Sequence, residues 1–234
     1  MVKIFFCAIL ILVTSFTSTA LAEERVPTIS VSGEGRVEAA PDCATISIGV
    51  TTFDNDAAKV QSENSRIATN VINAVASIGI DKKNIRTGNY SFQQRFRYDD
   101  KGKQIFDGYE VNNTVTIAVN DLTKIGRAID AALAGGANRV DSLNFGIRDR
   151  ENFQSEALKL AVRDARRKAE TAAAELGKRI VGIVNVSINS APIIAPRSEK
   201  LMMTSNAADS FSTPIEAGIL SCSASVHIDF EISK

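Results

Sequence analysis

The sequence predicts an α+β protein, with a mixed, mostly antiparallel sheet of about seven strands and three helices. Several stretches alternate apolar and polar residues, as half-buried strands do, and three others repeat apolar residues every three or four positions, as amphipathic helices do. Of the 234 residues, 44% are hydrophobic and 23% charged, which excludes a disordered chain or a collagen-like repeat. The 27 basic and 27 acidic residues balance, so composition indicates no nucleic-acid partner.

The first 22 residues predict a cleaved signal peptide. Lys3 precedes an apolar run at 4–13, and an A-x-A cleavage pattern ends at Ala22. The run is about ten residues long, whereas a membrane-spanning helix needs about 20. No cysteine stands at the cleavage point, so a lipid anchor is not expected, and an uncleaved anchor is the weaker alternative. We therefore expect an exported chain, residues 23–234, with no integral membrane segment after cleavage.

The first strand of the exported chain spans residues 28–38 and contains Gly33 and Gly35. These glycines are not followed by a helix or by a third glycine, so they do not form a nucleotide-binding loop. Glycine inside a strand more often marks a bulge or the close approach of another backbone. Residues 39–42, with a proline and an aspartate, predict a turn that closes a hairpin with the second strand, at 43–53.

The first helix follows three candidate N-caps at 54–56, and Gly79 ends it. Its apolar stripe comprises Val60, Ile67, Val71, Val75 and Ile78.

A hairpin with an irregular register is predicted next, around the polar loop at 99–103. If Phe96 faces Phe106, a regular ladder sets aromatic side chains against polar ones. One extra residue at Gly108 would repair this and pair Phe92 with Tyr109. We therefore predict a bulge at Gly108.

The second half of the chain contains two more helices, at 122–133 and 150–176. Alanines dominate the buried stripe of the longer helix and should let a neighbouring backbone approach closely. Further strands are expected at 140–147, 180–189 and 218–232, so the chain contains two strand–helix–strand units, at 43–98 and 140–189. Residues 190–214 hold three of the five prolines and two apolar islands. They predict a long loop or arm that docks on a neighbouring copy.

Two cysteines remain after cleavage, and strand parity places them on opposite faces. Cys43 shares the polar face of its strand, whereas Cys222 lies on the apolar face, so a disulfide is not expected. The single histidine, His227, lines up with Ser225 and Asp229 along one strand face, where a catalytic triad would have to converge on a pocket. The basic run at 163–168 has carboxylates at helical spacing and predicts a solvated face.

Several short motifs, in order and at matching spacing, give the chain a resemblance to the SIMPL-domain family. They are VSGEG at 31–35 with APD at 40–42, GI at 79–80 with IRT at 85–87, GYEVNNTV at 108–115, DL at 121–122, GGAN at 135–138, the helix at 156–169 and PIEAG at 214–218. The resemblance implies an exported α+β protein, at least some of whose relatives build large ring- or channel-like homo-oligomers, and a loose link to tolerance of oxidants. It supplies no catalytic residue.

The favoured hypothesis is a non-enzymatic periplasmic protein that assembles with itself and supports stress tolerance by binding or scaffolding. No catalytic, cofactor-binding or metal-ligating residue is predicted, and the expected partner is a second copy of the chain. The alternatives are a thiol-based antioxidant enzyme that uses Cys43 and a module that binds a small molecule between its helices and sheet. Asp42 would raise the pKa of the Cys43 thiol, which disfavours thiol chemistry.

Overall fold

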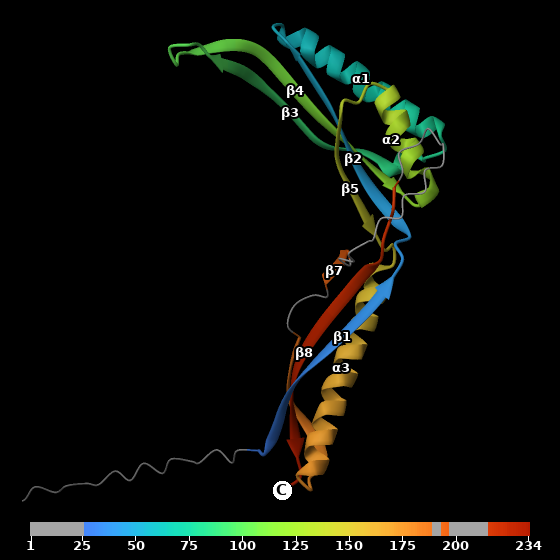
Figure 1. Cartoon of the computed structure of the whole chain (residues 1–234), viewed down its shortest axis with the longest axis vertical. Helices are drawn as coiled ribbons and strands as arrows, with labels where there is room; N and C mark the ends of the chain where they lie inside the picture. The colour runs from blue at the N-terminus through green and yellow to red at the C-terminus, as the bar shows by residue number, and fades with distance from the viewer. Residues whose placement is uncertain (1–25, 189–192, 197–214) are drawn as a thin grey trace, which may run out of the picture.

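The computed structural model describes residues 26–188, 193–196 and 215–234. The signal peptide predicted at 1–22 and most of the arm predicted at 190–214 lie outside these residues. The described chain forms two lobes, one above the other, each with a sheet covered by helices on one face (Figure 1). The predicted α+β class, with antiparallel strands and three α-helices, is confirmed.

We name each lobe after its helices. The α1–α2 lobe contains a sheet in the order β3-β4-β2-β5, and the α3 lobe contains a sheet in the order β1-β8-β6 with β7 also paired to β8. The elements of the α1–α2 lobe are β2 (Cys43–Asp54), α1 (Ala57–Ser77), β3 (Ile85–Tyr98), β4 (Gln104–Val119), α2 (Ile125–Ala134) and β5 (Arg139–Gly146), with short 3-10 turns at Lys82–Asn84 and Leu122–Lys124. Those of the α3 lobe are β1 (Thr28–Ala39), α3 (Arg150–Glu175), β6 (Ile180–Ile188), β7 (Ile193–Pro196) and β8 (Leu220–Ile232).

Four details of the predicted topology are corrected. The strands form two antiparallel sheets and not one mixed sheet. The turn at Pro41 joins the two sheets, because β1 pairs with β8 while β2 pairs with β4 and β5. The predicted unit at 140–189 runs from β5 in one sheet to β6 in the other. Four residues of the predicted arm form β7. Alternation identifies a strand, but it does not say which strand lies beside it.

The predicted bulge at Gly108 is confirmed. Two residues of β4 stand opposite Arg95 of β3, and Gly108 adopts a φ of +95°. The predicted partner of Phe92 is wrong, because Phe92 lies opposite Val111 and not Tyr109. An extra residue in β4 moves the partner one position further along that strand, and the prediction moved it the other way.

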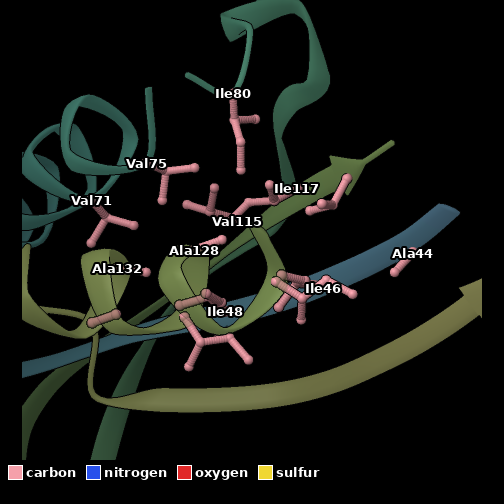
Figure 2. Packing of buried hydrophobic residues seen from close by; sticks show 14 of the residues in the cluster. Ala44, Ile46, Ile48, Val71, Val75, Ile80, Val115, Ile117, Ala128 and Ala132 are labelled. Carbon is pink, nitrogen blue, oxygen red and sulfur yellow. The ribbon is translucent and has the colours of Figure 1, made fainter. Parts of the chain in front are cut away.

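Each lobe has its own core. In the α1–α2 lobe, side chains of α1 and α2 meet those of β2 and β4 (Figure 2). The side chain of Asp56 caps α1 by accepting hydrogen bonds from the N–H groups of Ala58 and Lys59 at 2.8 and 3.1 Å. The labelled core residues are Ala44, Ile46, Ile48, Val71, Val75, Ile80, Val115, Ile117, Ala128 and Ala132.

The α3 lobe depends on very close packing of its helix against β1. A Cβ atom on Gly33 would lie 2.1 Å from the carbonyl oxygen of Ala161, and one on Gly35 would lie 2.1 Å from that of Ala157. Both alanines are fully buried. The close approach predicted from these glycines and from the alanine stripe is therefore confirmed. Leu176, the last residue of the predicted helix, is 64% exposed.

Candidate functional site

Cys43 lies where the two lobes join, beside the end of β5. The N–H of Asp42 donates to the carbonyl of Gly146 at 3.1 Å, and the backbone N–H and Nε of Arg148 donate to the Asp42 carboxylate at 2.8 and 3.2 Å. These contacts lower the pKa of Asp42, chiefly through the hydrogen bond from the Arg148 backbone. The junction is therefore held by a short chain of polar contacts.

Both described cysteines are free, and neither environment favours a thiolate. Burial and then the negative charge of Asp42 raise the pKa of the half-buried Cys43 thiol. Burial alone raises the pKa of Cys222, which lies in the core of the α3 lobe as strand parity predicts. Arg148 and Arg150 act in the opposite direction on Cys43, but burial and Asp42 outweigh them. Since the thiolate is the reactive form of cysteine, the raised pKa of each thiol disfavours thiol chemistry.

His227 has partners that the sequence did not identify. Its Nδ1 lies 3.2 Å from Oγ of Ser32 on β1, and its Nε2 lies 3.5 Å from the carboxylate of Asp229, which also accepts a hydrogen bond from Ser30 at 2.5 Å. The structure thus brings a serine, the histidine and an aspartate together, although the serine is Ser32 of β1 and not Ser225. The three groups lie on the face of the sheet that points away from the core of the α3 lobe, and they link β1 to β8. We therefore assign them to a polar sheet face.

The basic run on α3 is compensated by carboxylates, as its spacing predicts. Arg167 and Lys168 both pair with Asp164, and Arg166 pairs with Glu170 at 2.8 Å. The hydrogen bond from Lys168, followed by one from the backbone N–H of Glu34, lowers the pKa of Asp164 to about 2. The hydrogen bonds of Asp164 with Glu34 and of Lys168 with Ser32 attach the helix to β1, whereas the ion pairs within the helix lie on a solvated face.

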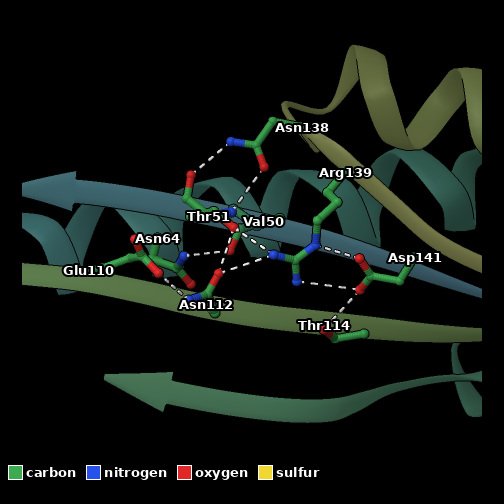
Figure 3. Close-up of polar contacts among 9 residues, drawn as sticks. All are labelled: Val50, Thr51, Asn64, Glu110, Asn112, Thr114, Asn138, Arg139 and Asp141. Carbon is green, nitrogen blue, oxygen red and sulfur yellow. Dashed lines mark hydrogen bonds and ion pairs between the residues drawn. The ribbon is translucent and has the colours of Figure 1, made fainter. Parts of the chain in front are cut away.

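A network around Arg139 holds β5 to the middle of its sheet, and sequence reasoning missed it. The guanidinium pairs with Asp141 and donates to Oγ1 of Thr51 at 3.1 Å and to Oδ1 of Asn112 at 3.2 Å (Figure 3). It lies over Gly49, where a Cβ would come within 2.7 Å of its Nε. A glycine inside a strand was the available signal.

Behind this network, Asn64 of α1 is fully buried against the sheet. Its amide nitrogen lies 3.0 Å from the carbonyl oxygen of Val50 and 3.3 Å from that of Val111, while its Oδ1 has no hydrogen-bond partner among the residues that the structure describes. The network and Asn64 connect strands and helix, so we assign both a structural role.

The most distinctive surfaces are two exposed apolar ones, each on a strand at the edge of its sheet. The first, which we call the aromatic face, lies on the β3–β4 hairpin and is about half exposed. It comprises Tyr90, Phe92, Phe96, Tyr98, Phe106 and the partly buried Tyr109.

The second surface, which we call the β6 edge, consists of aliphatic side chains that are each about half exposed. It comprises Val181, Ile183, Val184, Val186 and Ile188. Its signal in the sequence was an apolar run without clear alternation, which a buried strand would also show.

Two further features concern metal ions and membranes, in the part of the chain that the structure describes. No group of three or more His, Cys, Asp or Glu side chains there could hold a metal ion. No helix among those same residues is both long and apolar enough to cross a membrane.

Comparison with known proteins places the chain in a family. The model of the SIMPL family, described as "Protein of unknown function (DUF541)", matches residues 29–230. The "26 kDa periplasmic immunogenic protein" of Brucella melitensis is 32% identical over 95% of this chain and 94% of its own length, and that of Brucella abortus is equally similar. The "Uncharacterized protein YggE" of Escherichia coli K12 is 29% identical over 68% of this chain and 65% of its own length. The chain therefore belongs to the SIMPL family, as its motifs predict.

Proposed function

We propose that this chain is a periplasmic protein without catalytic activity that assembles with copies of itself and supports tolerance of oxidants by binding or scaffolding. The predicted signal peptide and the name of the Brucella relatives, which calls them periplasmic, support the location. The raised pKa values of Cys43 and Cys222 speak against the alternative of a thiol-based antioxidant enzyme.

The observation that carries the proposal is the exposed β6 edge. Strand β6 pairs with β8 along one side only, and its other side has no partner among the described strands. Its nine residues carry no charge and no proline, which are the features that keep other edge strands from pairing. Five neighbouring half-exposed aliphatic side chains form a patch of the kind that marks a protein–protein interface.

The gain from covering the β6 edge is substantial. Fully burying one Val or Ile side chain stabilises by about 1.5–3 kcal/mol, so covering five half-exposed ones contributes roughly 5 kcal/mol. Association itself costs an estimated 4–15 kcal/mol, so this contact needs backbone pairing or a second surface to give a stable assembly.

Native mass spectrometry of the protein purified from the periplasm tests the proposal. We expect several subunits for the wild-type chain and a lower subunit number for Val184→Lys, which places a charge in the β6 edge. The matched control is Val140→Lys, because Val140 lies on the edge strand β5 of the other lobe and is 43% exposed, against 54% for Val184. Circular dichroism should show that both variants fold. A monomeric wild-type protein would overturn the proposal.

A second measurement tests the absence of thiol chemistry. In a strain that lacks the protein, Cys43→Ser should restore survival in peroxide as well as the wild-type chain does, whereas Val184→Lys should restore it less. Peroxide consumption by the pure protein that Cys43→Ser abolishes would favour the antioxidant enzyme instead.

A further inference from the structure

The aromatic face is organised as a surface and not as a core. Phe92 and Phe106 contact Tyr109 with ring centroids 5.5 and 5.2 Å apart, and Phe96 contacts Phe106 at 6.1 Å. The rings thus form a continuous ladder along the hairpin, whose end projects away from α1 (Figure 1). Five of its six aromatic side chains are between 42% and 69% exposed.

The opposite face of the same hairpin is charged. Arg95 lies 3.4 Å from Asp107 and 3.9 Å from Glu110, and its guanidinium covers the ring of Phe53 at 5.2 Å. The hairpin is therefore amphipathic, with one solvated face and one face that lacks charged side chains. Such a division indicates that the aromatic face is covered by something outside the described chain.

The β6 edge lies too far away to cover the aromatic face of the same copy. Strand β6 pairs with residues 226–232 of β8, close to the C-terminus, whereas the hairpin projects from the other lobe (Figure 1). The two surfaces can meet only between copies.

We infer that the aromatic face of one copy docks on the β6 edge of a second copy, head to tail. This inference rests on the proposed function, since it names the surfaces through which the copies assemble. Both surfaces lack charge, and both include an edge strand, β3 or β6. The outer side of each has no partner among the described strands and can hydrogen-bond to another strand. Aromatic side chains paired across strands with β-branched ones such as Val and Ile are favourable.

A head-to-tail contact also covers both surfaces with a single type of interface. A symmetric contact between two β6 edges would leave both aromatic faces in water. A symmetric contact between two aromatic faces would leave both β6 edges in water. Half-exposed aromatic rings contribute about 100 Å² each, so the aromatic face supplies roughly 500 Å² of the ~800 Å² that each partner of a stable interface buries. A head-to-tail contact repeats from copy to copy, so it produces a closed ring or an open filament.

Mixing two variants tests the inference. Phe96→Glu should disable the aromatic face and Ile183→Glu the β6 edge, so each variant alone should be monomeric by native mass spectrometry. An equimolar mixture should form dimers and nothing larger, because the intact β6 edge of one variant can bind the intact aromatic face of the other. Phe53→Glu is the matched control, since Phe53 lies on the charged face of the hairpin region and is 71% exposed. It should assemble like the wild type.

The possible failures are distinguishable. If the wild type assembles and Phe96→Glu keeps the same subunit number, the aromatic face is not an interface and the inference is wrong, while the proposed self-assembly stands. If both variants are folded monomers by circular dichroism and their mixture also stays monomeric, the contact is not head to tail. If the wild type itself is a monomer, the proposed function and this inference both fail.

Discussion

Replacing Gly33 by alanine should separate α3 from its sheet. The added Cβ would lie 2.1 Å from the carbonyl oxygen of Ala161 and 2.5 Å from the backbone nitrogen of Ala165. Ordinary contacts at such a Cβ begin near 3.4 Å, so the helix must retreat by about 1 Å. A gap of 0.5–1 Å already removes about a quarter to a half of the dispersion energy of each contact that it opens.

The cost can be estimated from this geometry. Overpacking a core typically destabilises by about 1–3 kcal/mol, and side-chain adjustment relieves part of it. Here the obstructing atoms belong to the backbone of α3 and cannot adjust, so we expect a loss of about 3 kcal/mol in the free energy of unfolding. For a protein of this size that lowers Tm by roughly 6–12 °C.

Urea unfolding followed by circular dichroism measures the effect. The matched control is Gly182→Ala on β6, where the nearest atom to an added Cβ is the end of the flexible Glu231 side chain, at 3.0 Å. That variant should change the unfolding free energy by less than about 1 kcal/mol, because the carboxylate can move away. A loss below about 1 kcal/mol for Gly33→Ala would show that α3 does not lie this close to β1.

Three further predictions follow from single residues. Asn64→Ala should lower the free energy of unfolding, measured in urea, by about 2 kcal/mol, because buried carbonyl groups lose their hydrogen-bond donor. Asn70→Ala, at an exposed position of the same helix, should leave the free energy of unfolding unchanged. The Asp164 carboxylate, whose pKa is lowered to about 2, stabilises the folded chain fully above about pH 4 and loses this effect as the pH falls toward 2. Asp164→Asn should therefore flatten the pH dependence of the urea midpoint between these pH values. An unchanged slope would contradict this reasoning. At pH 7, iodoacetamide should modify Cys43 more slowly than free cysteine, and Asp42→Asn should speed the reaction; a wild-type rate above that of free cysteine would be inconsistent with the raised pKa.

Local features of this protein follow from the sequence because their causes are local. The cap at Asp56, the end of α1 near Gly79 and the bulge at Gly108 depend on residues a few positions apart. The meaning of Gly33 and of the alanine stripe of α3 was also predictable, since small residues in two elements indicate that backbones approach closely. The buried position of Cys222 followed from the alternation of its own strand.

Features that depend on which strands become neighbours were not predictable from alternation. The turn at Pro41 connects two sheets and does not close a hairpin, because the pairing of β1 with β8 joins residues about 190 positions apart. The same pairing brings Ser32 to His227, and the pairing of β5 with β2 brings Arg139 over Gly49.

The two candidate interfaces, the aromatic face and the β6 edge, also combine a feature that is visible in the sequence with one that depends on the fold. The richness of residues 180–188 and of the hairpin around 99–103 in apolar side chains is visible in the amino-acid sequence. That these side chains are exposed is a property of the folded chain, because exposure depends on where helices end and on which strands occupy the edges of a sheet. Alternation records the two faces of a strand, whereas its free edge is a property of the assembled sheet.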